Sequence, residues 1–123
     1  MTREIVGKYF GTEINQQWWK RYSKNKMLAR GNGKFSYNEH AISFLRLLTK
    51  TPIVIEFTKI LDFKLGKWHA GQWGAGRPII KILWKNNDQL LSSGFSISAE
   101  SDEFESVISE LRNALESNNN GII

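Results

Sequence analysis

The spacing of apolar residues changes abruptly near residue 100, and this change constrains the fold more than any other feature of the sequence. Between residues 41 and 98, short apolar runs alternate with turn-forming residues, the period-two pattern of half-buried antiparallel strands. From Ser101 onward, apolar residues recur with the 3.6-residue period of a helix. We therefore predict an α+β, mainly β fold: an antiparallel sheet followed by one C-terminal amphipathic helix.

Six segments carry strand signals and together predict an antiparallel meander. They are residues 27–35 (an edge strand with a glycine turn), 41–48, 53–57, 60–65, 79–85 and 89–98. Residues 41–48 also fit a helix, but the run is short and bounded by turn-forming residues, which favours a strand. Alternation predicts the residues that share one face in three of these segments: Leu61, Phe63 and Leu65 in residues 60–65, Ile80, Ile82 and Trp84 in residues 79–85, and Leu91, Ser93, Phe95 and Ile97 in residues 89–98.

Helical signals are strongest after residue 100. Ser101 is a candidate cap, and one continuous apolar stripe follows it: Phe104, Val107, Ile108, Leu111 and Leu115. Residues 117–123 are predicted to be a frayed tail. Near the N-terminus, Thr12 can cap a short helix over residues 13–22; a strand is the alternative there.

The length and charge of the chain bound its class. With 123 residues and no cysteine, it is expected to form one domain held by packing, and a cytoplasmic location is the default. Within that domain we expect a basic aromatic segment (residues 1–25), a sheet with its helix (26–117) and a flexible tail (118–123). The net charge of +5 combines a basic body with an acidic C-terminal region. Two interpretations stay open: the basic body binds an acidic partner surface, or the acidic C-terminal region balances its charge within the fold.

A glycine- and tryptophan-rich loop, residues 66–78, is the first candidate site. Glycines permit unusual backbone angles, and indoles supply contact area that a plain connector does not need. We predict a partner-binding rim made by Trp68, His69, Trp73 and Arg77. The alternative is that the two indoles fold back as a plug over their own sheet.

The second candidate site is residues 18–26, where aromatic side chains alternate with cations. Trp18, Trp19, Lys20 and Arg21 suit stacking on nucleic-acid bases, or a lipid interface. The alternative is that one indole enters the core while the cations stay solvated.

No reactive constellation accompanies these segments. The two histidines, His40 and His69, lack metal-ligand spacing, and the sequence has no cysteine nucleophile and no glycine-flanked serine elbow. We therefore expect no catalytic residues, no metal and no cofactor, and a protein that is not an enzyme.

The order of elements resembles the pleckstrin-homology-like (PH-like) superfold, including GRAM-type and bacterial PH-like domains. The resemblance covers roughly residues 26 to 117 and includes the succession of a polar turn and apolar strand at 38–44 and a further strand at 52–60. The resemblance implies a bent antiparallel sheet or sandwich, a PH-like barrel closed by the C-terminal amphipathic helix, which is used as a binding or assembly module. We expect a module that binds a protein or an anionic surface through the glycine-tryptophan loop, with nucleic-acid binding through residues 18–26 as the alternative and the oligomeric state open.

Overall fold

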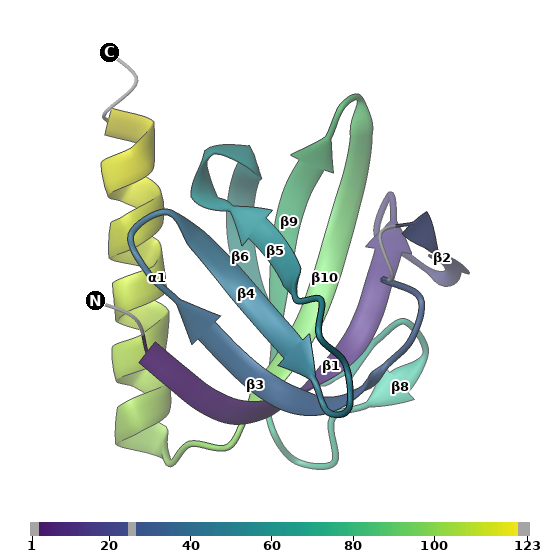
Figure 1. Ribbon diagram of the computed structural model, residues 1–123, viewed down its shortest axis with the longest axis horizontal. Coiled ribbons are helices and arrows are strands. Elements are labelled where there is room, and N and C mark those ends of the chain that lie inside the picture. Colours follow the sequence, from purple (N-terminus) through teal and green to yellow (C-terminus); the bar gives the residue numbers. More distant parts are fainter. Residues whose placement is uncertain (1–2, 25–26, 121–123) are drawn as a thin grey trace.

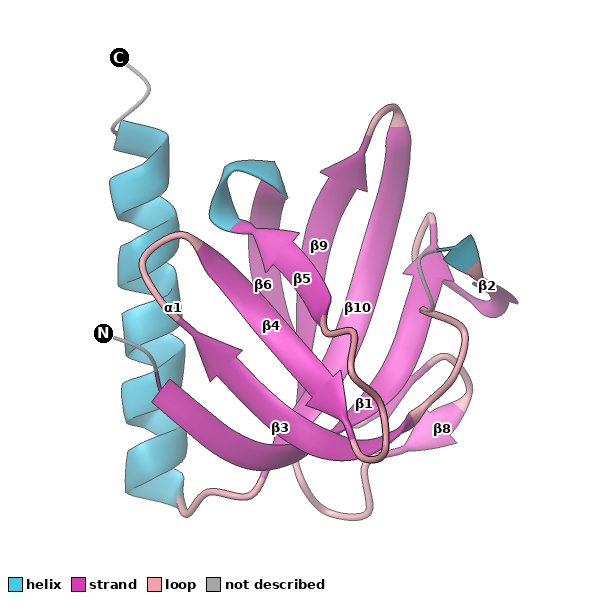
Figure 2. Cartoon of the chain, viewed as in Figure 1, coloured by secondary structure: helices cyan, strands magenta, loops and turns pink. Residues whose placement is uncertain are grey.

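A curled antiparallel sheet, with one long helix packed along its open side, makes up the structure (Figure 1). The computed structural model describes residues 3–24 and 27–120. Most of the described elements are strands, and the α-helix is the last element in the described chain (Figure 2). The elements are β1 (Arg3–Ile14), β2 (Gln17–Arg21), β3 (Gly31–Tyr37), β4 (Ala41–Arg46), β5 (Ile53–Glu56), the 3₁₀ turn η2 (Phe57–Lys59), β6 (Ile60–Gly66), β7 (Trp68–His69), β8 (Gln72–Trp73), β9 (Ile79–Asn86), β10 (Gln89–Ile97) and α1 (Ser101–Asn120).

The strand order is β5-β4-β3-β1-β10-β9-β6, with β2 paired to the end of β1. The predicted strands are confirmed, but they do not form a simple meander, because β1 lies between β3 and β10 at the centre of the sheet. The prediction of an edge strand at residues 27–35 is wrong for the same reason: β3 is paired on both sides. The chain end that looked peripheral in sequence is therefore the strand that joins the two halves of the sheet.

The helix expected over residues 13–22 is not formed. Residues 15 and 16 instead turn the chain back on itself with positive φ angles of 53° and 58°, and β2 follows. Positive φ at both central residues is what a tight two-residue hairpin requires. The strand alternative is correct for residues 17–21, which form β2.

Inward-facing apolar side chains of the sheet form the core. The predicted faces of β9 and β10 are confirmed, and an aromatic group from four strands fills the centre: Tyr9, Phe35, Phe44 and Phe95. In β6 the expected face is wrong, because a register shift between Ile60 and Asp62 interrupts the alternation and leaves Leu61 exposed. Such a bulge lets Ile60 and Phe63 both point inward.

The amphipathic helix is confirmed as α1. Val107 and Leu111 are fully buried against the sheet, and the other three stripe residues are partly buried. The first turn is closed by the Glu100 carbonyl, which accepts from Phe104 N–H at 2.7 Å, so Ser101 lies inside the helix and is not its cap.

Polar contacts fix α1 at its middle and near its C-terminus. Glu110 accepts from the Tyr37 hydroxyl at 2.7 Å and from Arg3 at 3.1 Å. Near the C-terminus, Asn118 donates to the Glu39 carbonyl at 3.0 Å. The helix therefore continues to Asn120, and the tail predicted for residues 118–123 is helical where the structure describes it; residues 121–123 lie outside the described residues.

Candidate partner-binding surface

The glycine-tryptophan segment is an ordered hairpin. Ala70 and Gly71 turn the chain with φ angles of 49° and 80°, and Trp68 pairs with Trp73 across the two short strands β7 and β8. Side chains alternate across a strand, so the two indoles share the outer face. Their ring centroids are 6.5 Å apart, and they are 59% and 55% exposed, which is inconsistent with the core-plug alternative for this loop.

His69 lies on the inner face of the same hairpin and is buried, so its assignment to an exposed rim is wrong. Its Nε2 lies 3.1 Å from the Gly11 carbonyl oxygen and 2.9 Å from that of Ser92. The ring covers Gly94 of β10 so closely that a Cβ at residue 94 would fall 2.5 Å from the imidazole. His69 therefore attaches the hairpin to the outer face of the sheet, and glycine at residue 94 makes room for it.

Burial also sets the ionisation of His69. It lowers the pKa of the imidazole to about 4, while the Glu13 carboxylate beside it opposes the shift and Lys81 adds to it. The histidine is consequently neutral at neutral pH. Glu13 in turn accepts a hydrogen bond from the Ala70 backbone N–H at 2.7 Å, a second attachment of the hairpin to β1.

The basic aromatic segment is the second hairpin, β1–β2. Ile14 pairs with Gln17 and Glu13 with Arg21, so residues 18–20 bulge outward between these pairs. Trp18 and Trp19 are 61% and 59% exposed and meet edge to face, with ring centroids 5.7 Å apart. Neither indole enters the core, contrary to the structural alternative for this segment.

Arg21 differs from its neighbours because it is tied into the fold. Its guanidinium covers Gly11 and donates to the Leu28 carbonyl, and burial, then the nearby Arg30, lowers its pKa. Lys20, in contrast, is exposed. Of the two cations predicted here for binding, only Lys20 is free to reach outward. Of the other two lysines in residues 18–26, Lys24 is exposed and Lys26 lies outside the described residues.

The two hairpins meet. The Trp18 ring lies over Gly71, where an added Cβ would be 3.2 Å from it, and Arg30 donates to the Ala70 carbonyl at 2.6 Å. Folding thus brings two tryptophan pairs, 50 residues apart in sequence, to one end of the molecule (β2 and β8 in Figure 1). We call them the indole cluster: Trp18, Trp19, Trp68 and Trp73.

Positive charge surrounds the indole cluster. Residues 14–38 and 63–87, which contain the two hairpins, include eleven lysines and arginines and not one aspartate or glutamate. The acidic helix α1 lies across the molecule from β2 and β8 (Figure 1). The absence of aspartate and glutamate from these two segments is a sequence signal of this surface, and the tryptophans by themselves do not reveal it. The charge separation seen along the sequence is therefore also a separation in space.

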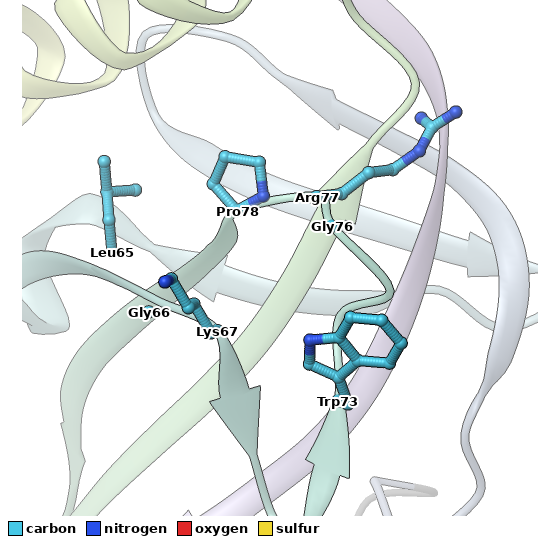
Figure 3. A pocket seen from close by; sticks show the side chains of 7 residues that line it. All are labelled: Leu65, Gly66, Lys67, Trp73, Gly76, Arg77 and Pro78. Carbon is cyan, nitrogen blue, oxygen red and sulfur yellow. The ribbon is translucent and has the colours of Figure 1, made fainter.

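Trp73 stands between two hollows. One, of about 530 Å³, is shown in Figure 3 and is lined by Leu65, Gly66, Lys67, Trp73, Gly76, Arg77 and Pro78. The other, of about 410 Å³, lies between Trp73 and residues of β1 and β10. The Arg77 side chain extends away from the Trp73 ring and donates to the Ile97 carbonyl at 3.2 Å (Figure 3). Arg77 is thus exposed beside Trp73, but part of its hydrogen-bonding capacity is used within the fold.

No group of three or more histidine, aspartate or glutamate side chains in residues 3–24 and 27–120 is placed to hold a metal ion. Within the same ranges, no helix combines the length and apolar character needed to cross a bilayer.

A curled antiparallel sheet with a C-terminal helix packed against it is consistent with a PH-like fold. The family model described as bacterial PH domain-like matches residues 1–112, and the chain belongs to that family. The match begins at residue 1, well before the start of the resemblance noted in the sequence at residue 26, because β1 is a central strand of the fold. No curated protein matches the chain. PH-like domains generally serve as non-catalytic binding or assembly modules.

Proposed function

We propose that this protein is a non-catalytic, cytoplasmic binding module that holds an acidic protein face, or another anionic surface, against the indole cluster. The observation that carries the proposal is the exposure of four of the five tryptophans at the basic end of the molecule. Tryptophan is largely buried on average, and aromatic residues exposed together are typical of interfaces.

Trp73 is the expected anchor of this surface. It is paired with Trp68, flanked by two hollows and placed among Lys67 and Arg77. A partner side chain entering either hollow would contact the indole and a cation together, an arrangement typical of binding hot spots. The basic surroundings would also speed encounter with an acidic surface.

Trp73→Ala should weaken binding to a partner captured by the wild-type protein by about tenfold or more, the loss expected for an anchor. Because the indole is exposed, the free energy of unfolding should change by no more than about 0.5 kcal/mol. Affinity is measured by titration with the purified partner, or with phosphatidylglycerol vesicles for the anionic-surface arm, and stability by urea denaturation. Val54→Ala, an exposed apolar residue on β5, is the matched control. A strongly destabilised Trp73 variant that still binds its partner would show that the indole supports the fold and does not anchor the partner.

Nucleic-acid binding remains the second candidate because Trp18, Trp19 and Lys20 all project from the β2 bulge. Exposed indoles beside a cation suit stacking on bases together with contact to a phosphate.

If this candidate is correct, affinity for a fluorescent single-stranded oligonucleotide should fall steeply with salt, and Lys20→Ala should reduce the slope of log K against log salt by about 0.7. Lys59→Ala, an exposed lysine on η2, should leave the slope unchanged. Absence of binding at low salt would remove nucleic acid as a candidate.

A further inference from the structure

A cavity of about 510 Å³ lies where the two hairpins meet. Trp18 and Trp68 line it from β2 and β7, Glu13 and His69 line its inner part, and Lys81 lines it from β9. It is therefore a site built from four elements, in which indole surface faces a carboxylate, an imidazole and an ammonium. Pockets of this size with a few convergent polar groups are typical of small-ligand sites.

The hydrogen bonds of His69 fix which of its nitrogens carries the proton. Nε2 faces two carbonyl oxygens, of Gly11 and Ser92, and carbonyls only accept hydrogen bonds. Nε2 must therefore be the donor, and in the neutral ring Nδ1 is left as an acceptor. The side chain is fully buried, and no group among the described residues donates to Nδ1.

The carboxylate beside Nδ1 is itself an acceptor. Glu13 Oε2 lies 3.7 Å away, and the carboxylate is also buried, with the Ala70 backbone N–H as its donor. Two acceptors face each other here, which is unfavourable unless a donor bridges them. One nitrogen placed about 2.8 Å from each would form both hydrogen bonds, because the two acceptors are close enough to share it.

The remaining lining groups indicate what kind of molecule would carry that donor. A primary ammonium has several N–H donors, is attracted to a buried carboxylate and interacts favourably with indole faces. Lys81 would repel a simple cation, but it would pair with an anionic group on the same molecule. The cavity is thus lined by one negative charge, on Glu13, and one positive charge, on Lys81.

We infer that this cavity binds a small zwitterion, whose primary ammonium donates to Glu13 and His69 Nδ1 while its anionic group pairs with Lys81. The ligand's carbon skeleton lies against Trp18 and Trp68. This site shares the indoles of Trp18 and Trp68 with the proposed partner surface and adds the buried groups between the hairpins. Trp73, the expected anchor of the partner surface, does not line the cavity. A free amino acid, phosphoethanolamine and a phosphatidylethanolamine headgroup share the required chemistry.

Calorimetric titration with three probes tests the site. Phosphoethanolamine and glycine should bind, whereas phosphocholine, whose quaternary ammonium has no N–H donor, should bind about tenfold or more weakly. Vesicles that contain phosphatidylethanolamine form a separate arm: binding there identifies a lipid headgroup as the source, and binding of the soluble probes alone identifies a free ligand. Equal affinity for phosphocholine, or no binding of any primary-ammonium probe, would overturn the inference.

Variants locate the binding. Glu13→Gln and Trp18→Ala should each weaken phosphoethanolamine binding by about tenfold, since one removes the charge partner and the other an indole wall. Trp19→Ala is the matched control, because Trp19 is equally exposed, is adjacent in sequence and does not line the cavity. Trp73→Ala should also leave this binding unchanged, which separates failure of this site from failure of the partner surface.

A measurement on the wild-type protein avoids the risk that Glu13→Gln unfolds the hairpin. With ¹⁵N-labelled histidine, the Nδ1 resonance of His69 should move on addition of phosphoethanolamine, because that nitrogen gains a hydrogen bond, and the exposed His40 provides the internal reference. An unchanged Nδ1 resonance at saturating phosphoethanolamine would overturn the assignment.

Discussion

Replacing Leu111 with alanine is expected to lower the free energy of unfolding by about 2–5 kcal/mol. Leu111 is fully buried in the middle of the α1 stripe and belongs to the same core cluster as the aromatic residues of the sheet. Truncation removes apolar contacts from the sheet–helix interface and leaves a cavity there, since hydrogen bonds at Glu110 and Asn118 hold α1 in place and limit its relaxation into the space.

Urea denaturation of the Leu111→Ala variant measures this loss. Asn113→Ala, at an exposed position two residues further along the same helix, is the control and should change stability by no more than about 0.5 kcal/mol. A Leu111 variant as stable as the control would mean that α1 does not belong to the core.

Acidification should destabilise the protein through His69. The folded-state pKa of this histidine is about 4, below its ordinary value of 6.5, so the unfolded chain binds the proton more readily. The free energy of unfolding should therefore fall as the pH falls from about 6.5, by about 2 kcal/mol at pH 5 and about 3 kcal/mol at pH 4, and then level off with respect to this group. Protonation would place a charge against buried backbone at the point where the β7–β8 hairpin attaches.

Urea denaturation at pH 7 and pH 5 isolates this effect, because most carboxylates titrate below that window. His69→Gln should lose the dependence, whatever its effect on stability at pH 7, while His40→Gln, at an exposed histidine, should retain it. An equal pH dependence in the wild-type protein and the His69 variant would contradict the assignment.

The buried histidine and the exposed indoles share one origin. In β7–β8, alternation places Trp68 and Trp73 on one face and His69 on the other. Since His69 points toward the sheet, the neighbouring indoles must point to solvent. Reading the loop as a strand pair would have predicted this division, but Ala70–Gly71 gives a weaker hairpin signal than the Asn–Gly or Asp–Gly pairs that mark such turns.

The sequence alone determined the elements whose signals are local. The change of period at Ser101 predicted α1 and its buried face, and alternation predicted β9 and β10, because burial on one side of an element imposes its own spacing on the chain. The resemblance to PH-like domains followed from the order of these elements and is confirmed by the family match.

Only the tertiary structure decided where the ends of these elements meet. Residues 13–22 carry helix and strand signals of similar strength, and the pairing of β2 with the end of β1 selects the strand. The convergence of Trp18 with Trp68, and of Glu13 with His69, depends on contacts between residues about 50 positions apart. No local spacing encodes such contacts, because strand order and hairpin docking are set by the packing of the whole sheet.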